Sequence, residues 1–140
     1  MRRLLAGQSL AVVATQAESA LHASLVAFVA TPDLRRVAFA TPRTTRKFAN
    51  LAAHPRVALL MDDRSHSRTD FYDATAITVV GEAYEAWGDE RQALLALYLQ
   101  AHPHLRDFVD APICALVAVR VERYSVVTQF QNVMELVCEP

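Results

Sequence analysis

A run of nine residues stands where a predicted strand gives way to a predicted helix, and it holds the densest polar chemistry in the chain. The run reads Phe39-Ala40-Thr41-Pro42-Arg43-Thr44-Thr45-Arg46-Lys47. A helix start carries partial positive charge and unpaired backbone amides, so cations in its first turn are unfavourable unless an anion binds there. With an anion present, the amides, the threonine hydroxyls and the side chains of Arg46 and Lys47 would converge on a phosphate group. The alternative is a solvated cationic turn whose threonines only cap the helix.

The histidines and carboxylates elsewhere in the chain form weaker patterns. His102 and His104 stand close together, but no third ligand follows at a suitable spacing, so we expect no metal site. Asp62 and Asp63 are adjacent in a predicted strand, and their side chains should point to opposite faces, which prevents them from sharing one proton. This pattern therefore predicts neither metal chemistry nor a carboxylate pair.

Arg64 has two interpretations. It is either an electrostatic partner of a bound ligand or a surface ion-pair partner of Asp70 or Asp73. His22 precedes a predicted strand and either donates a hydrogen bond to a ligand or adds polarity to a loop. No serine has the glycine context of a nucleophile elbow, so the sequence does not support serine hydrolysis.

Composition excludes several classes of protein. The 140 residues are 53% apolar, which fits one domain spanning residues 1–140. Three glycines are too few for a glycine-rich dinucleotide turn or a Walker loop. The formal net charge of −1 gives no field that attracts nucleic acid or an anionic membrane. No stretch reaches the roughly 18 apolar residues of a membrane span. We expect a cytoplasmic protein in which Cys114 and Cys138 are reduced.

Hydrophobic periodicity predicts a β-rich chain with two helices. Strands are expected over Leu10–Thr15, Ser24–Thr31, Arg36–Thr41, Arg56–Asp62, Thr75–Trp87 and, as one or two strands, Ile113–Phe130. The middle of the strand Arg56–Asp62, Val57 to Met61, is apolar on both faces, as in the centre of a barrel. A short amphipathic helix is expected over Thr44–His54 and a second from an N-cap at Asp89, with Gln92 at N3, to about Ala101. The polar segment Ser65–Asp73 reads as a loop. The leucine-rich stripe around Tyr98 in the second helix reads as core or dimer packing.

The strands follow one another too closely for parallel crossovers. The fold class is therefore mainly β: a closed or split antiparallel β-barrel with two peripheral helices.

Several segments together resemble a known family. They are Arg46-Lys47 followed by Phe48-Ala49-Asn50-Leu51 and Pro55-Arg56-Val57-Ala58-Leu59-Leu60, the upstream His22-Ala23-Ser24-Leu25-Val26-Ala27-Phe28 and Phe39-Ala40-Thr41, and the downstream Met61-Asp62-Asp63-Arg64-Ser65 and Thr78-Val79-Val80-Gly81. Their order and spacing resemble those of pyridoxamine-phosphate-oxidase-like flavoproteins, which have an FMN-binding split barrel. The resemblance covers most of Leu10 to Phe130.

The resemblance implies a flavin mononucleotide (FMN) at the interface of a homodimer. Arg46 and Lys47 would bind its phosphate with help from Thr41, and a strand such as Ser24 to Val26 would line the isoalloxazine ring. Late-strand residues of the partner subunit would close the site. The complete set of cofactor-binding candidates is Ser24, Leu25, Val26, Ala40, Thr41, Arg43, Thr45, Arg46, Lys47, Arg64, Tyr124, Gln129 and Phe130.

Two functions follow from this resemblance. The first is an FMN-dependent oxidoreductase acting on an unidentified small molecule, in which the cofactor carries the redox chemistry. The second is a flavin or haem carrier or sensor without turnover. The chain lacks the carboxy-terminal Arg and His pair that vitamin-processing members use, which argues against pyridoxamine phosphate as the substrate. A single-stranded nucleic-acid barrel is disfavoured because no strand face combines aromatic and basic residues.

Overall fold

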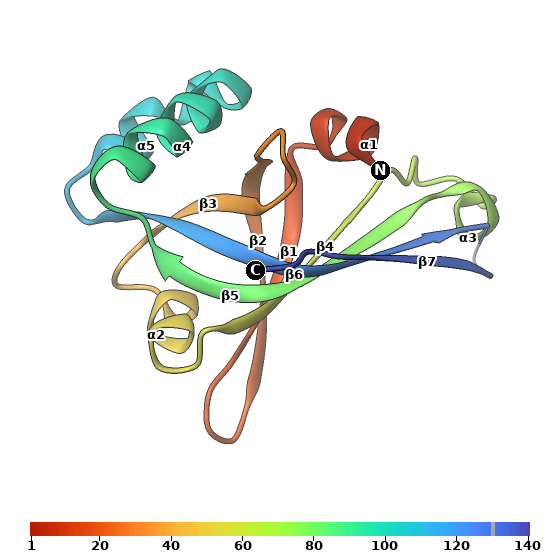
Figure 1. Cartoon of the computed structure of the whole chain (residues 1–140), viewed down its shortest axis with the longest axis horizontal. Coiled ribbons are helices and arrows are strands. Elements are labelled where there is room, and N and C mark those ends of the chain that lie inside the picture. Colours follow the sequence, from red (N-terminus) through yellow and green to blue (C-terminus); the bar gives the residue numbers. More distant parts are fainter. Residues whose placement is uncertain (130) are drawn as a thin grey trace.

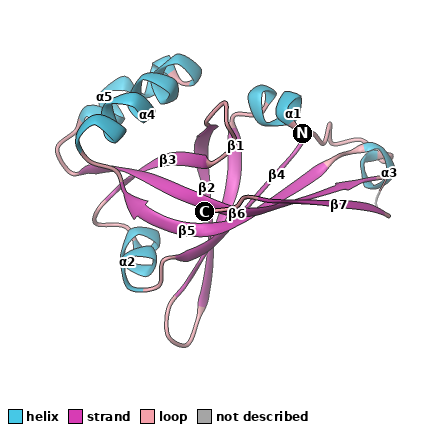
Figure 2. Cartoon of the chain, viewed as in Figure 1, coloured by secondary structure: helices cyan, strands magenta, loops and turns pink. Residues whose placement is uncertain are grey.

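The strands of the chain form one antiparallel sheet that curls into a barrel (Figures 1 and 2). The computed structural model describes residues 1–129 and 131–140. Within them the strands are β1 (Leu10–Gln16), β2 (Leu21–Ala30), β3 (Arg36–Pro42), β4 (Arg56–Asp62), β5 (Ala76–Glu85), β6 (Cys114–Thr128) and β7 (Asn132–Val137). Their order is β3-β2-β1-β4-β5-β6-β7, and β3 also pairs with β6. This last pairing closes six strands into a barrel and leaves β7 at the outer edge of β6.

Short helices lie around the barrel. They are α1 (Arg2–Gly7), α2 (Arg46–Ala53), α3 (Asp70–Asp73), α4 (Gly88–Ala101) and α5 (Arg106–Asp110), with a 3-10 turn η1 (Pro103–Leu105) before α5. In Figure 1, α4 and α5 lie together on one side of the barrel, and α2 lies apart from them, where β3 leads into it. None of the helices in the described residues is long and apolar enough to cross a membrane.

Alternation along the strands separates two apolar clusters. The first fills the barrel, and each closing strand contributes to it, with Val13, Phe28, Phe39, Leu59, Val79 and Val117 as examples. The second lies outside the barrel, where Leu94 and Tyr98 of α4 and Val109 of α5 cover Ala38 of β3 and Leu116 of β6. The apolar run of β6 is thus buried on both faces because it lies between the barrel interior and the helices.

The opposite outer face of the sheet has no such cover in the described residues. Leu25 of β2 pairs with Val12 of β1, which pairs with Leu60 of β4, so the three side chains form one row across this face. Leu25 is 63% exposed and Leu60 is 39% exposed. The middle of β4, Val57 to Met61, is apolar on both faces in the sequence, but the structure buries only the side chains that point into the barrel.

A β-bulge interrupts the pairing of β5 with β6 between Val80 and Gly81. A Cβ built at Gly81 would lie 2.1 Å from the carbonyl oxygen of Arg120. Only glycine permits this approach of the two backbones, so Gly81 is required for the close pairing of β5 with β6 at the bulge.

The predicted mainly β barrel and its strands are confirmed, and the segment Ile113–Phe130 contains one long strand in its described part. The predicted N-cap at Asp89 is wrong. Helix α4 begins at Gly88, whose φ of +60° turns the chain one residue earlier, and its N-cap Trp87 makes no side-chain cap bond. Local sequence patterns did not predict α1, α3, α5 and β7.

Candidate functional site

The barrel is split between β2 and β3. The ladder joining these strands contains only Phe28–Ala30 and Val37–Phe39. Beyond it, β2 continues towards Leu21 beside β1, and β3 continues to Pro42 beside β6. We call the place where they diverge the split, bounded by residues 24–27 of β2 and residues 40–42 of β3.

The backbone of β2 offers hydrogen-bonding groups to the split. The N–H of Phe28 donates to the carbonyl of Ser9 at 3.1 Å, on the β1 side. Backbone groups of successive residues in an antiparallel strand point to alternate sides, so those of Leu25 and Ala27 point the other way, into the split. The backbone N–H and C=O of Leu25 therefore face an edge that no described strand occupies.

Helix α2 starts just after the C-terminal end of β3, next to the split. Its N-cap is Thr45, whose Oγ1 accepts a hydrogen bond from the N–H of Phe48 at 3.2 Å. The Oγ1 of Thr41, which is fully buried, lies 2.9 Å from the Oγ1 of Thr45. The Nζ of Lys47 donates to the same Thr41 Oγ1 at 3.4 Å. The structure thus brings together Thr41, Thr45 and Lys47, as predicted from their spacing.

The two cations of α2 differ in their surroundings. Lys47 is half-buried, and desolvation lowers the pKa of its ammonium group. Arg46 is exposed and makes no hydrogen bond or ion pair with any described residue. The first turn of α2 contains no acidic residue. A free guanidinium, a desolvated ammonium and the helix amides are the donor set that a phosphate requires.

Arg43 lies in a different environment from the other cations of the run. Its guanidinium pairs with both carboxylate oxygens of Glu85, with Nε to Oε1 at 3.0 Å, and donates to the carbonyl of Pro112 at 2.7 Å. The guanidinium also lies 5.4 Å from the ring centroid of Trp87. Arg43 therefore joins the end of β3 to the end of β5, and its charge is already paired with a carboxylate.

Arg64 is likewise paired within its own turn. Its Nε and Nη2 each donate to a carboxylate oxygen of Asp62 at 2.8 Å. This guanidinium lowers the pKa of the Asp62 carboxyl group. An ion pair is thus present at Arg64, but the partner is Asp62 and not the predicted Asp70 or Asp73.

The predicted ring-binding strand presents its three residues in two directions. Val26 is buried in the barrel, and Ser24 has the same orientation by strand alternation. The Oγ of Ser24 is buried and has no hydrogen-bond partner among the described residues. Leu25 points outward onto the uncovered face. A ring beside this strand would contact the Leu25 side chain and backbone. Ala40, at the other edge of the split, is buried beneath α4.

Two of the three predicted late-strand residues, Tyr124 and Gln129, lie in different environments. The side chain of Tyr124 is completely buried inside the barrel, where its hydroxyl donates to the carbonyl of Leu34 at 2.7 Å. It is therefore out of reach of a ligand in another subunit. Gln129 is exposed at the turn between β6 and β7, where its side-chain oxygen accepts a hydrogen bond from Asn132. Phe130 lies outside the described residues.

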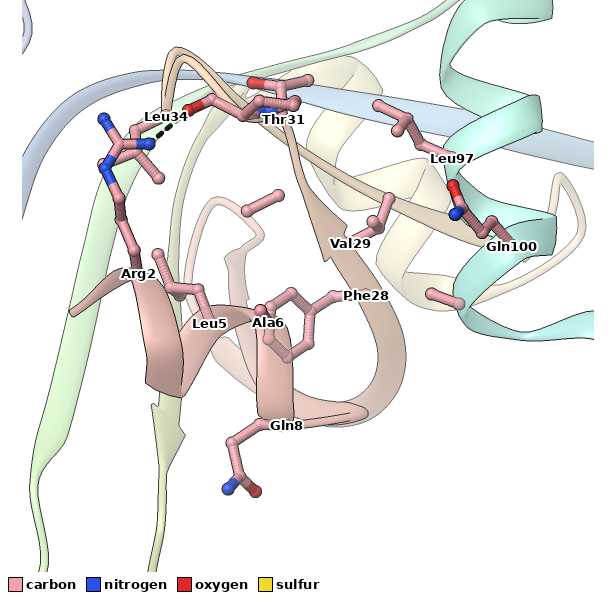
Figure 3. A pocket seen from close by; sticks show the side chains of 13 residues that line it. Arg2, Leu5, Ala6, Gln8, Phe28, Val29, Thr31, Leu34, Leu97 and Gln100 are labelled. Carbon is pink, nitrogen blue, oxygen red and sulfur yellow. Dashed lines mark hydrogen bonds between the residues drawn. The ribbon is translucent and has the colours of Figure 1, made fainter.

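A pocket of about 430 Å³ lies away from the α2 cations, between α1, β2 and α4. In Figure 3, Leu97 and Gln100 of α4 face Phe28 and Val29 of β2, with Leu5 of α1 on another wall. None of its lining residues belongs to the predicted phosphate site, so this pocket is distinct from that site.

The sequence matches the model of one protein family, described as pyridoxamine 5'-phosphate oxidase, over residues 1–127. The chain belongs to the pyridoxamine 5'-phosphate oxidase family. The match includes the barrel strands almost to the end of β6, the split and α2. No curated protein matches the chain.

Solved structures with the same fold carry different descriptions. A haem-binding protein from Mycobacterium smegmatis is 21% identical with a TM-score of 0.85, and the match covers 96% of this chain and 55% of that one. ChuZ from Campylobacter jejuni is 12% identical with a TM-score of 0.82, over 97% and 57% of the two chains. An FAD-binding protein from Mesorhizobium loti is 13% identical with a TM-score of 0.73, over 89% and 87%. At these identities the matches establish the shared fold. The chain spans little more than half of the first two proteins.

One residue at the split was not among the predicted site residues. The hydroxyl of Tyr98, on α4, donates to the carbonyl of Ala27 at 3.0 Å. In the sequence, Tyr98 stands within a leucine-rich helix and reads as core packing. The only signal was a hydroxyl on an otherwise apolar face, since a buried tyrosine requires a hydrogen-bond partner.

Proposed function

We propose that the chain is an FMN-binding flavoprotein that works as a homodimer and acts as an oxidoreductase on a small molecule. The observation that carries the proposal is the pair of cations, Arg46 and Lys47, at a helix start beside the split. Family membership supports a flavin, because this fold typically binds one.

The phosphate would be held at the start of α2. Arg46 supplies an unengaged guanidinium, and Lys47 an ammonium held beside the Thr41 hydroxyl. The pKa of Lys47 is lowered because its charge is poorly solvated. A dianion would supply the compensating charge that the described protein groups lack. Arg43 and Arg64 are outside this set because their carboxylate partners occupy them.

The ring would lie along β2 at the uncovered face. The backbone N–H and C=O of Leu25 offer one donor and one acceptor, which suit the alternating acceptors and donors at the edge of an isoalloxazine. The exposed side chain of Leu25 offers apolar contact next to Val12 and Leu60. When bound, the flavin would supply the electron-transfer chemistry, while the protein binds it, orients it and excludes water.

A second copy of the chain is the partner that suits the uncovered face. A row of exposed apolar side chains across a sheet costs free energy in water, and burying it against a symmetry-related copy removes that cost. The interface would then cover the ring as well. Sedimentation of the flavin-loaded protein tests this directly, and a flavin-loaded monomer would contradict it.

The alternative is a carrier or sensor that binds flavin or haem without turnover. Its support is the fold shared with the haem-binding protein from Mycobacterium smegmatis. The same two cations would suit the carboxylates of a haem.

The visible spectrum of the purified protein, followed by titration with FMN and with riboflavin, separates these functions. An oxidised-flavin spectrum that bleaches with a reduced nicotinamide supports the oxidoreductase. Bound flavin that is not reduced supports the carrier, and a Soret band supports haem. FMN should bind far more tightly than riboflavin, which lacks the phosphate. Equal affinities for the two would refute the phosphate site.

A further inference from the structure

The hydroxyl of Tyr98 occupies the position where the ladder between β2 and β3 would otherwise continue. The last pair of that ladder is Phe28 with Phe39, so the next pair in register would be Ala27 with Ala40. The backbone groups of both residues point into the split by strand alternation. In a continuous sheet, the carbonyl of Ala27 would accept a hydrogen bond from the N–H of Ala40.

The hydroxyl of Tyr98 stands between those two groups. It donates to the carbonyl of Ala27 at 3.0 Å, and the backbone N–H of Ala40 faces the same hydroxyl and lowers its pKa against the effect of burial. The side chain is 1% exposed, and burial raises its pKa to about 12, so the hydroxyl is neutral and keeps its proton for Ala27. One phenol group thus replaces one hydrogen bond of the sheet.

The helix that carries Tyr98 is fixed independently of the split. One turn further along, Nε2 of His102 lies 2.7 Å from the carbonyl of Phe28, and because a carbonyl only accepts, Nε2 carries the proton. The ring of His102 packs beside that of Tyr98, with centroids 4.9 Å apart. His102 is therefore a nearby contact of the same kind that does not reach into the split.

We propose that Tyr98 is a positioning residue for flavin. It holds β2 and β3 apart, which leaves the Leu25 backbone free to bind the isoalloxazine ring. The same contact sets the distance between the Leu25 backbone and Thr41 at the phosphate site. This inference rests on the proposed function. Without the hydroxyl, Ala27 and Ala40 can bond directly, and the two strands approach each other.

Tyr98→Phe removes the hydroxyl and keeps the aromatic ring, which packs between α4 and the sheet. The loss of the two hydrogen bonds between the Leu25 backbone and the isoalloxazine ring corresponds to about 10- to 100-fold weaker flavin binding. Because the phosphate contacts do not change, FMN and riboflavin should lose affinity by the same factor. Replacing the α2 cations should instead weaken FMN alone. The matched control is Tyr124→Phe, which also removes the hydroxyl of a buried tyrosine that donates to a backbone carbonyl, but inside the barrel and away from the split, and which should leave both affinities unchanged.

Three outcomes are decisive. A folded Tyr98→Phe protein with parental flavin affinity overturns this inference and leaves the proposed function intact. A parent that binds no flavin overturns both. Amide hydrogen exchange of the flavin-free parent gives a test that needs no variant. The amide of Ala40 should be protected by the Tyr98 hydroxyl, and the amide of Leu25 should become protected only when FMN is added. Equal exchange of the two amides without flavin would show that the bridge does not form.

Discussion

Replacing Arg46 and Lys47 together by alanine should remove the preference of the protein for FMN over riboflavin. Lys47 is half-buried beside Thr41, so its charge-assisted contact to a phosphate should contribute about 1.5 to 3 kcal/mol. Arg46 is exposed and its charge is screened by solvent, so its contact to the phosphate should contribute about 1 kcal/mol. Together they amount to about 3 kcal/mol, or roughly 100-fold in the dissociation constant.

The flavin-free protein should tolerate this change. Neither side chain contributes to the core, and removing cations from a helix start relieves an unfavourable interaction with the dipole. Burial lowers the pKa of Lys47, which means that folding is opposed while the ammonium is charged, so its removal should not lower the free energy of unfolding. Circular dichroism and thermal unfolding of the variant would check this.

The pH dependence of FMN binding gives a second measure of Lys47. Burial lowers the pKa of Lys47 in the free protein, and a bound phosphate should raise it again. At pH values between these two pKa values, FMN binding is therefore coupled to the uptake of a proton by Lys47. Affinity should therefore fall as the pH rises through the lowered pKa of the free protein and towards the raised pKa of the complex. Lys47→Ala should lack this alkaline decline.

A matched control removes two exposed arginines far along the chain, Arg68 and Arg106, which causes the same change in net charge. Calorimetric titration of both double variants with FMN at fixed ionic strength would separate a local site from general electrostatic attraction. The proposed phosphate site is refuted if the Arg46 and Lys47 variant stays folded and binds FMN as tightly as the parent. It is also refuted if the control loses as much affinity.

Three further predictions concern single residues. Gly81→Ala should destabilise the protein by on the order of 3 kcal/mol or more, because its Cβ would lie 2.1 Å from the Arg120 carbonyl oxygen, whereas Gly7→Ala, with nothing within 4 Å, should be neutral or slightly stabilising in thermal unfolding. Arg43→Ala should lower Tm through loss of its ion pair, yet its FMN dissociation constant should stay within about threefold of the parent, since that guanidinium is already engaged. Tyr124→Phe should cost about 1 to 3 kcal/mol in urea unfolding, because a buried carbonyl loses its donor; an unchanged midpoint would contradict the placement of that hydroxyl.

Local signals in the sequence were sufficient to predict the barrel strands and α2, and to place Thr41, Thr45 and Lys47 close together. Alternation of apolar residues predicted the barrel strands, because residues two apart share one face of a strand whatever the fold. Thr45 and Pro55 bracket α2, since capping and the geometry of proline act within a few residues. The proximity of Thr41 to Lys47 follows from the same short range, six residues apart on either side of a helix cap.

Only the tertiary structure decided which polar groups remain available to a ligand. Arg43 and Lys47 look equivalent in the sequence, yet Glu85, 42 residues further on, pairs with Arg43. The hydroxyl of Tyr98 reaches the carbonyl of Ala27 across 71 residues. Such partners meet because the register of the sheet and the packing of α4 bring them together, and neither is encoded in local spacing. A charge pattern determines what a segment can bind, whereas long-range contacts determine which of its groups are already occupied.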